Sequence, residues 1–112
     1  MPSHLFIPPP APCCSPSNFH ITILNSTAVE ASWFLPTYLY GLNGRLIGFK
    51  IFVDKFNGSV RIIDIPDSTL QAYIITGLEP ATLYTLSILM YNTVADGPEG
   101  IRLRVMMPDS GV

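Results

Sequence analysis

The sequence predicts an all-β protein, a seven-stranded antiparallel β-sandwich. Apolar and polar residues alternate along short runs that turn signals separate, which is the spacing of strands in sandwiches and barrels. The segment 78–84 contains Pro80 and ends on Tyr84, the first residue of an alternating run. In antiparallel sandwiches such a tyrosine bonds its hydroxyl to the backbone upstream and locks the crossover between sheets, a tyrosine corner. No helical period competes with this alternation.

The expected strands follow one another from residue 17 onward. In each run every second side chain faces the core. The hairpin signal Asn57-Gly58 joins the third run to a fourth at 60–65, which ends before Pro66. The expected inward-facing residues of the other six runs are Phe19, Ile21 and Ile23; Val29, Ala31 and Trp33; Ile47, Phe49, Ile51 and Val53; Tyr73 and Ile75; Leu86, Ile88 and Met90; and Ile101, Leu103 and Val105.

We divide the chain into a proline-rich linker at 1–15, one domain at 16–107 and a C-terminal linker at 108–112. The prolines of the first segment favour an extended polyproline II conformation. Pro9 and Pro12 also have the spacing of ligands for SH3-type domains, although no basic residue flanks them. Cys13 and Cys14 are adjacent, which strains a bond between them. We therefore expect free thiols here, or disulfides to a partner outside this fragment.

Composition argues against several functions. The 112 residues are 48% hydrophobic and carry a net charge of −2 with a pI near 5.4. This balance gives no basic surface for nucleic acid, and no apolar run approaches the ~20 residues of a membrane-spanning helix. His20 stands alone on an outward face, away from any serine and carboxylate that could complete a catalytic triad. We expect no enzyme activity, no cofactor and no metal site.

Several residues, in this order and spacing, resemble a fibronectin type III domain from residue 16 to about residue 107. A true immunoglobulin domain would place cysteines in the second and sixth strands and its tryptophan in the third, whereas here Leu86 follows Tyr84 by two residues. The departures are Phe49 for the family's usual tyrosine and Ala95 where many repeats have glycine. The matching residues are Pro16, Trp33, Asn43-Gly44, Gly48-Phe49, Leu78-x-Pro80-x-Thr82-x-Tyr84, Asn92 and Gly97-Pro98.

The resemblance implies an immunoglobulin-like sandwich that acts as a non-catalytic spacer and protein-interaction module. The sequence is similar to repeats of adhesion and guidance receptors and of receptor-type tyrosine phosphatases. We therefore expect the extracellular part of a plasma-membrane protein, monomeric in isolation, whose partners are adjoining domains or an extracellular ligand. The alternative is an intracellular cytoskeletal module that serves as a scaffold. The expected structural core consists of Trp33, Phe49, Leu78, Tyr84, Leu86 and Ile88.

Two N-glycosylation sequons support the extracellular setting. Asn25-Ser26-Thr27 and Asn57-Gly58-Ser59 both satisfy the acceptor pattern. Turn geometry alone would also explain the second. In this topology the two sequons lie at one end of the sandwich, and the loops at 36–43 and 92–98 lie at the other.

Partner binding is expected at that second end. The loop at 36–43 is apolar and aromatic for a surface connection, and exposed tyrosines are favoured interface anchors. The candidate binding residues are Tyr38, Leu39, Tyr40 and Leu42. The alternative is that these side chains fold back and cap the core. A second patch comprises Phe52, Leu89 and Tyr91 with Lys50, Arg102 and Arg104 around them, where we expect cross-strand cation–π stacking rather than a binding surface.

Overall fold

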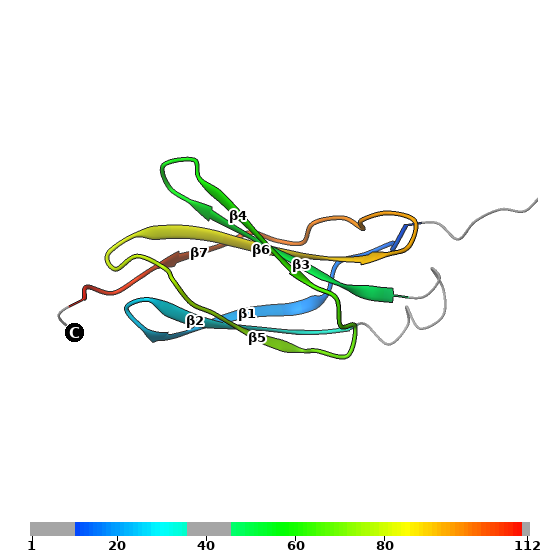
Figure 1. Cartoon of the computed structure of the whole chain (residues 1–112), viewed down its shortest axis with the longest axis horizontal. Helices are drawn as coiled ribbons and strands as arrows, with labels where there is room; N and C mark the ends of the chain where they lie inside the picture. The colour runs from blue at the N-terminus through cyan, green and yellow to red at the C-terminus, as the bar shows by residue number, and fades with distance from the viewer. Residues whose placement is uncertain (1–10, 36–45, 111–112) are drawn as a thin grey trace, which may run out of the picture.

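A computed structural model describes residues 11–35 and 46–110, which form seven β-strands in two antiparallel sheets (Figure 1). One sheet has the order β1-β2-β5, and the other has the order β4-β3-β6-β7. The described residues contain no helix. The strands are β1 (Ser17–Asn25), β2 (Ala28–Phe34), β3 (Leu46–Lys55), β4 (Val60–Ile65), β5 (Ala72–Ile75), β6 (Leu83–Asn92) and β7 (Leu103–Met106).

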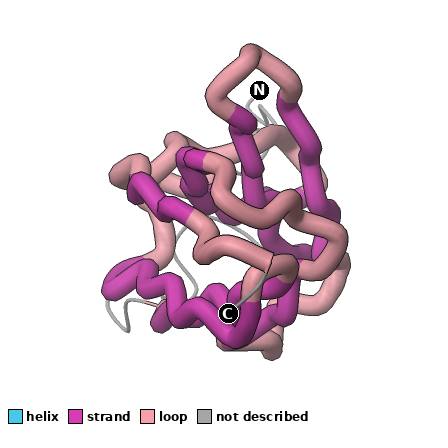
Figure 2. Tube along the Cα trace, turned by 90° about the vertical axis from the view of Figure 1, so that its left-hand side faces the viewer, coloured by secondary structure: helices cyan, strands magenta, loops and turns pink. Residues whose placement is uncertain are grey.

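The core lies between the two sheets, which Figure 2 shows from the end of the sandwich. In β3 the buried Phe49, Ile51 and Val53 alternate with more exposed residues, whereas in β6 the whole run from Leu86 to Met90 is buried. Trp33 of β2 and Phe49 of β3 meet across the interface with ring centroids 5.2 Å apart and planes at 58°. The six residues expected in the core, Trp33, Phe49, Leu78, Tyr84, Leu86 and Ile88, are all buried, none more than 5% exposed.

The tyrosine corner predicted from the sequence is confirmed. The backbone N–H of Glu79 donates a hydrogen bond of 2.8 Å to the hydroxyl oxygen of Tyr84. Thr82 donates its hydroxyl to the carbonyl of Pro80 at 2.9 Å in the same crossover. These bonds fix the path by which the chain leaves β5 in one sheet and enters β6 in the other.

The turns and loops gather at two opposite ends of the sandwich. We call the end with the β1–β2 and β3–β4 turns the turn pole, and the end with the β6–β7 connection and the strand ends that flank residues 36–45 the loop pole (Figure 1). At the turn pole the predicted Asn57-Gly58 hairpin is present. The N–H of Gly58 donates to the carbonyl of Lys55 at 2.9 Å, and Gly58 has a φ of 97°, which glycine adopts readily.

Three residues expected to face the core do not. The β3–β6 register shifts between Leu46 and Gly48, so Leu46 packs against the core in place of Ile47. Ile23 is 44% exposed because it lies near the end of the edge strand β1, where the ladder to β2 is also irregular. Ile101 is 70% exposed because β7 begins only at Leu103. The segment before β7 is held by Glu99, which accepts a hydrogen bond from Ser87 and pairs with Arg102.

The expectation that the cysteines are unbonded to each other was wrong for this structure. Cys13 and Cys14 form a disulfide with each other, and the described residues contain no free cysteine. The bond lies in a bend of the segment 11–16, in which Pro12 and Pro16 are buried and Cys14 packs against the core. Adjacency discourages a disulfide but does not forbid it.

Candidate functional site

The loop pole is the end where partner binding was expected. Tyr38, Leu39, Tyr40 and Leu42 lie outside the described residues, so their role stays a prediction. Leu35 and Leu46, on either side of that stretch, both pack against the core. The two residues that flank the 36–45 segment are therefore anchored, and Leu46 pairs with Asn92 at the start of the β6–β7 connection.

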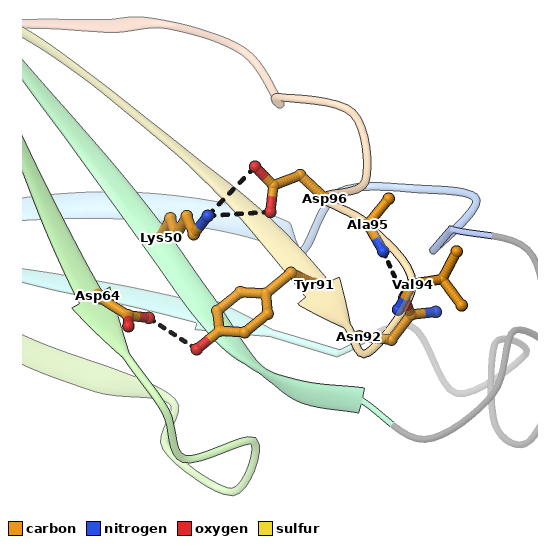
Figure 3. A network of polar contacts seen from close by, with 7 residues as sticks. All are labelled: Lys50, Asp64, Tyr91, Asn92, Val94, Ala95 and Asp96. Carbon is orange, nitrogen blue, oxygen red and sulfur yellow. Dashed lines mark hydrogen bonds and ion pairs between the residues drawn. The ribbon is translucent and has the colours of Figure 1, made fainter.

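The β6–β7 connection begins with a capped turn. Asn92 is 5% exposed, and its side-chain oxygen accepts hydrogen bonds from the backbone N–H groups of Val94 at 2.9 Å and Ala95 at 3.0 Å. The N–H of Asn92 donates to the carbonyl of Ala95 at 3.2 Å. Asparagine is suited to this role because its side chain mimics a backbone turn. Ala95, which stands where many repeats of the family have glycine, is thus held in a defined turn (Figure 3).

A polar network ties the same connection to the outer face of the four-stranded sheet (Figure 3). Lys50 of β3 binds both carboxylate oxygens of Asp96, with distances of 3.1 and 3.3 Å. The ammonium group also lies 5.2 Å from the centroid of the Tyr91 ring. The Tyr91 hydroxyl donates to Asp64 of β4 at 2.7 Å. Four segments of the chain are joined by these contacts.

The network changes the acidity of Tyr91. The hydrogen bond to the Asp64 carboxylate is the largest cause, and together with burial and the charges of Asp64 and Asp96 it raises the pKa of Tyr91 to about 12. A phenolate would face the two carboxylates, so the neutral phenol is favoured. The cation–π contact in this patch is made by Lys50 rather than by an arginine, and the polar ends of Lys50 and Tyr91 are both satisfied within the domain.

Other members of that second patch behave differently from Tyr91. Leu89 is 5% exposed and Phe52 is half-buried, so neither offers much free surface. Arg102 pairs with Glu99 at 3.2 Å, and Glu99 also accepts a hydrogen bond from the buried hydroxyl of Ser87. No sequence pattern indicated this role of Glu99, since Glu99 and Ser87 lie 12 residues apart.

Both sequons lie in exposed turns at the turn pole. The side-chain oxygen of Asn25 accepts hydrogen bonds from the backbone N–H of Thr27 at 2.9 Å and from its hydroxyl at 3.1 Å. The side-chain oxygen of Asn57 accepts one from the N–H of Ser59 at 3.1 Å. These bonds use only the oxygen of each amide. The nitrogen Nδ2, the atom that carries an N-linked glycan, is left outside them.

A shallow pocket of about 160 Å³ opens beside the β3–β4 hairpin. Val53, Leu78 and Tyr84 line its floor, and Lys55 and Arg61 are among its polar residues. Lys55 is paired with Glu79 at 2.5 Å, and Arg61 donates to the carbonyl of Thr76 at 2.7 Å. Among the described residues no group of three or more histidine, cysteine or carboxylate side chains could hold a metal ion.

Known proteins similar to this chain agree with the fold. Residues 14–105 match the family model of the fibronectin type III domain. The chain is 29% identical over 91 residues to human receptor-type tyrosine-protein phosphatase F, a match that covers 81% of this chain and 5% of that protein. It is 32% identical over 91 residues to chicken protein sidekick-1, covering 78% of this chain and 4% of that protein. The chain thus spans a small fraction of these relatives.

The structural comparison gives the same result. The third fibronectin III domain of human KIAA0343 protein superimposes with a TM-score of 0.78 at 26% identity, covering 88% of this chain and 84% of that domain. Residues 11–35 and 46–110 contain no helix that is long and apolar enough to cross a membrane. The match over residues 14–105, the two-sheet architecture and the tyrosine corner lead to one conclusion: the chain belongs to the fibronectin type III family.

Proposed function

We propose that this chain is an extracellular spacer and protein-interaction module of a larger cell-surface receptor or adhesion protein. Repeats of this family occur in relatives named as receptor-type phosphatases and as a cell adhesion molecule, Dscam2 of Drosophila melanogaster. The observation that carries the proposal is the placement of both sequons. Each lies in an exposed turn, and both turns belong to the turn pole.

The geometry of the sequons suits glycosylation in the folded domain. The hydrogen bonds to the Asn25 and Asn57 side-chain oxygens orient each amide without using its nitrogen. A glycan on Nδ2 would therefore leave those bonds intact. N-linked glycans are added in the secretory pathway, so their presence would place the module outside the cell.

Glycans at the turn pole would direct partners to the loop pole. Two bulky, hydrated sugars at one end hinder protein contacts there. The opposite end presents a connection that Asn92, Lys50 and Asp96 hold in a fixed conformation, and Asn92 pairs with Leu46, the residue that follows the segment with Tyr38 and Tyr40. Rigid scaffolds that present loops in this way are common binding surfaces.

Expression in a secretory cell line tests the extracellular proposal. We expect the secreted domain to lose mass on treatment with an N-glycosidase, and the single variants Asn25→Gln and Asn57→Gln each to lose one glycan. Asn92, an asparagine outside any sequon, is the internal control and should stay unmodified. If neither sequon carries a glycan, the intracellular scaffold becomes the better explanation.

A further inference from the structure

The segment 11–16 lies along the β6–β7 connection at the free edge of the four-stranded sheet. Gly97 and Gly100 make this approach possible. A Cβ atom at Gly97 would be 2.9 Å from the Cβ of Pro12, and one at Gly100 would be 3.0 Å from the hydroxyl oxygen of Ser15. The chain therefore touches the sheet edge on both sides of the two cysteines.

This contact is made by a segment that is itself hydrogen-bonded to β6. Gly97 and Gly100 donate their own N–H groups to the carbonyls of Met90 and Ile88 in β6, at 2.8 and 3.0 Å. Pro12 and Ser15 lie against the Cα hydrogens of the same two glycines, where any side chain would collide with them.

The disulfide lies between Pro12 and Ser15, the two residues of the segment that contact Gly97 and Gly100. Cys13 is exposed to solvent, whereas Cys14 packs against the core. A bond between adjacent residues closes a small ring that includes their peptide group, and the ring fixes the bend between Pro12 and Ser15. One sulfur is thus within reach of a dissolved thiol, while the bond constrains the backbone that holds the segment on the sheet.

We propose that the Cys13–Cys14 bond is a thiol–disulfide exchange site whose reduction releases the segment 11–16 from the sheet edge. A thiolate of a small thiol or of a thiol oxidoreductase attacks one sulfur and forms a mixed disulfide, and the other cysteine leaves as a thiolate and takes up a proton. A second thiol resolves the mixed disulfide. Two electrons enter the pair, which becomes two thiols, and the reductant becomes a disulfide.

Opening the ring frees the backbone dihedrals of both cysteines. A residue whose backbone is no longer fixed samples many more conformations, so freeing even one shifts a docking equilibrium by roughly tenfold. The expected products are a released N-terminal segment and an uncovered β6–β7 connection at 97–100. This inference does not depend on glycosylation or on the binding partner. It can therefore fail while the proposed function holds, and the proposed function can fail while this inference holds.

Alkylation and hydrogen exchange on the secreted domain provide the test. Without reductant we expect no alkylated cysteine, and with dithiothreitol under native conditions two alkyl groups per chain. Reduction should raise amide exchange about tenfold at residues 13–15, and clearly at Gly97 and Gly100, but not in the turn at Asn25 to Thr27. The double variant Cys13→Ser/Cys14→Ser should exchange like the reduced protein and should not respond to dithiothreitol.

Gly100→Ala is the matched variant that leaves both cysteines in place. Its Cβ would press on Ser15, so we expect the segment to be released while the disulfide remains, and the disulfide to be reduced at a lower dithiothreitol concentration than in the parent. Three results would overturn the proposal. They are alkylation before reduction, a bond that resists dithiothreitol in the folded protein, and reduction that leaves exchange at 13–15 and 97–100 unchanged.

Discussion

Replacing Tyr84 with phenylalanine removes the tyrosine corner and little else. The ring is 5% exposed, and phenylalanine keeps its shape and packing. The change deletes the 2.8 Å bond from the Glu79 N–H, which is only partly buried, so water can replace the lost acceptor in part. We expect a loss of about 1–2 kcal/mol in the free energy of unfolding. For a domain of this size the thermal midpoint should fall by about 4–8 °C for each kcal/mol lost.

Urea denaturation of the parent and of Tyr84→Phe measures this loss. The midpoint should fall while the slope of the free energy with urea stays the same, because the core exposed on unfolding is unchanged. Tyr73→Phe is the matched control, since Tyr73 is half-buried on β5 and no described hydrogen bond uses its hydroxyl. A Tyr84→Phe protein as stable as Tyr73→Phe would refute the stabilising role of the corner.

Three further substitutions have defined outcomes. Trp33→Ala should lower the free energy of unfolding by roughly 3–5 kcal/mol in urea denaturation. The Trp33 ring is 1% exposed and contacts Phe49, so its removal leaves a cavity in the core. A loss under about 1 kcal/mol would contradict this. Asp64→Asn should lower the pKa of Tyr91 from about 12 toward 10 in an ultraviolet titration. Because the folded pKa is raised, the stability that neutral Tyr91 contributes is complete below pH 10 and is lost as the pH rises through about 12, and pH-dependent denaturation of both proteins should show this difference. Tyr38→Ser/Tyr40→Ser should change the free energy of unfolding by less than ~0.5 kcal/mol if both rings are exposed anchors. A large loss of that free energy would favour the alternative that these rings cap the core.

The strand pattern could be predicted because alternation and turn residues act locally. The residues that enclose β4, Asn57-Gly58 before it and Pro66 after it, gave its bounds of Val60–Ile65 correctly. Tyr84 was predictable for the same reason, since its partner Glu79 is only five residues away. In these cases the signal and the structure it determines lie in the same short segment.

Contacts between distant segments could not be predicted in this way. Lys50 and Asp96 are 46 residues apart, and nothing near either residue shows that the strand register brings them together. The bulge that moves Leu46 inward in place of Ile47 depends on the pairing of β3 with β6. Nothing near Cys13 and Cys14 in the sequence likewise shows that the segment carrying them lies against Gly97 and Gly100.

Site-specific cross-linking tests most directly whether the loop pole is the interaction surface. A photoreactive amino acid would replace Tyr40 in cell-expressed protein that contains this domain, and the control would carry it at Leu24, an exposed residue at the turn pole. The account predicts that position 40 cross-links to protein, either an adjoining domain or a separate chain, and that position 24 does not. Cross-links from position 24 with none from position 40 would contradict it.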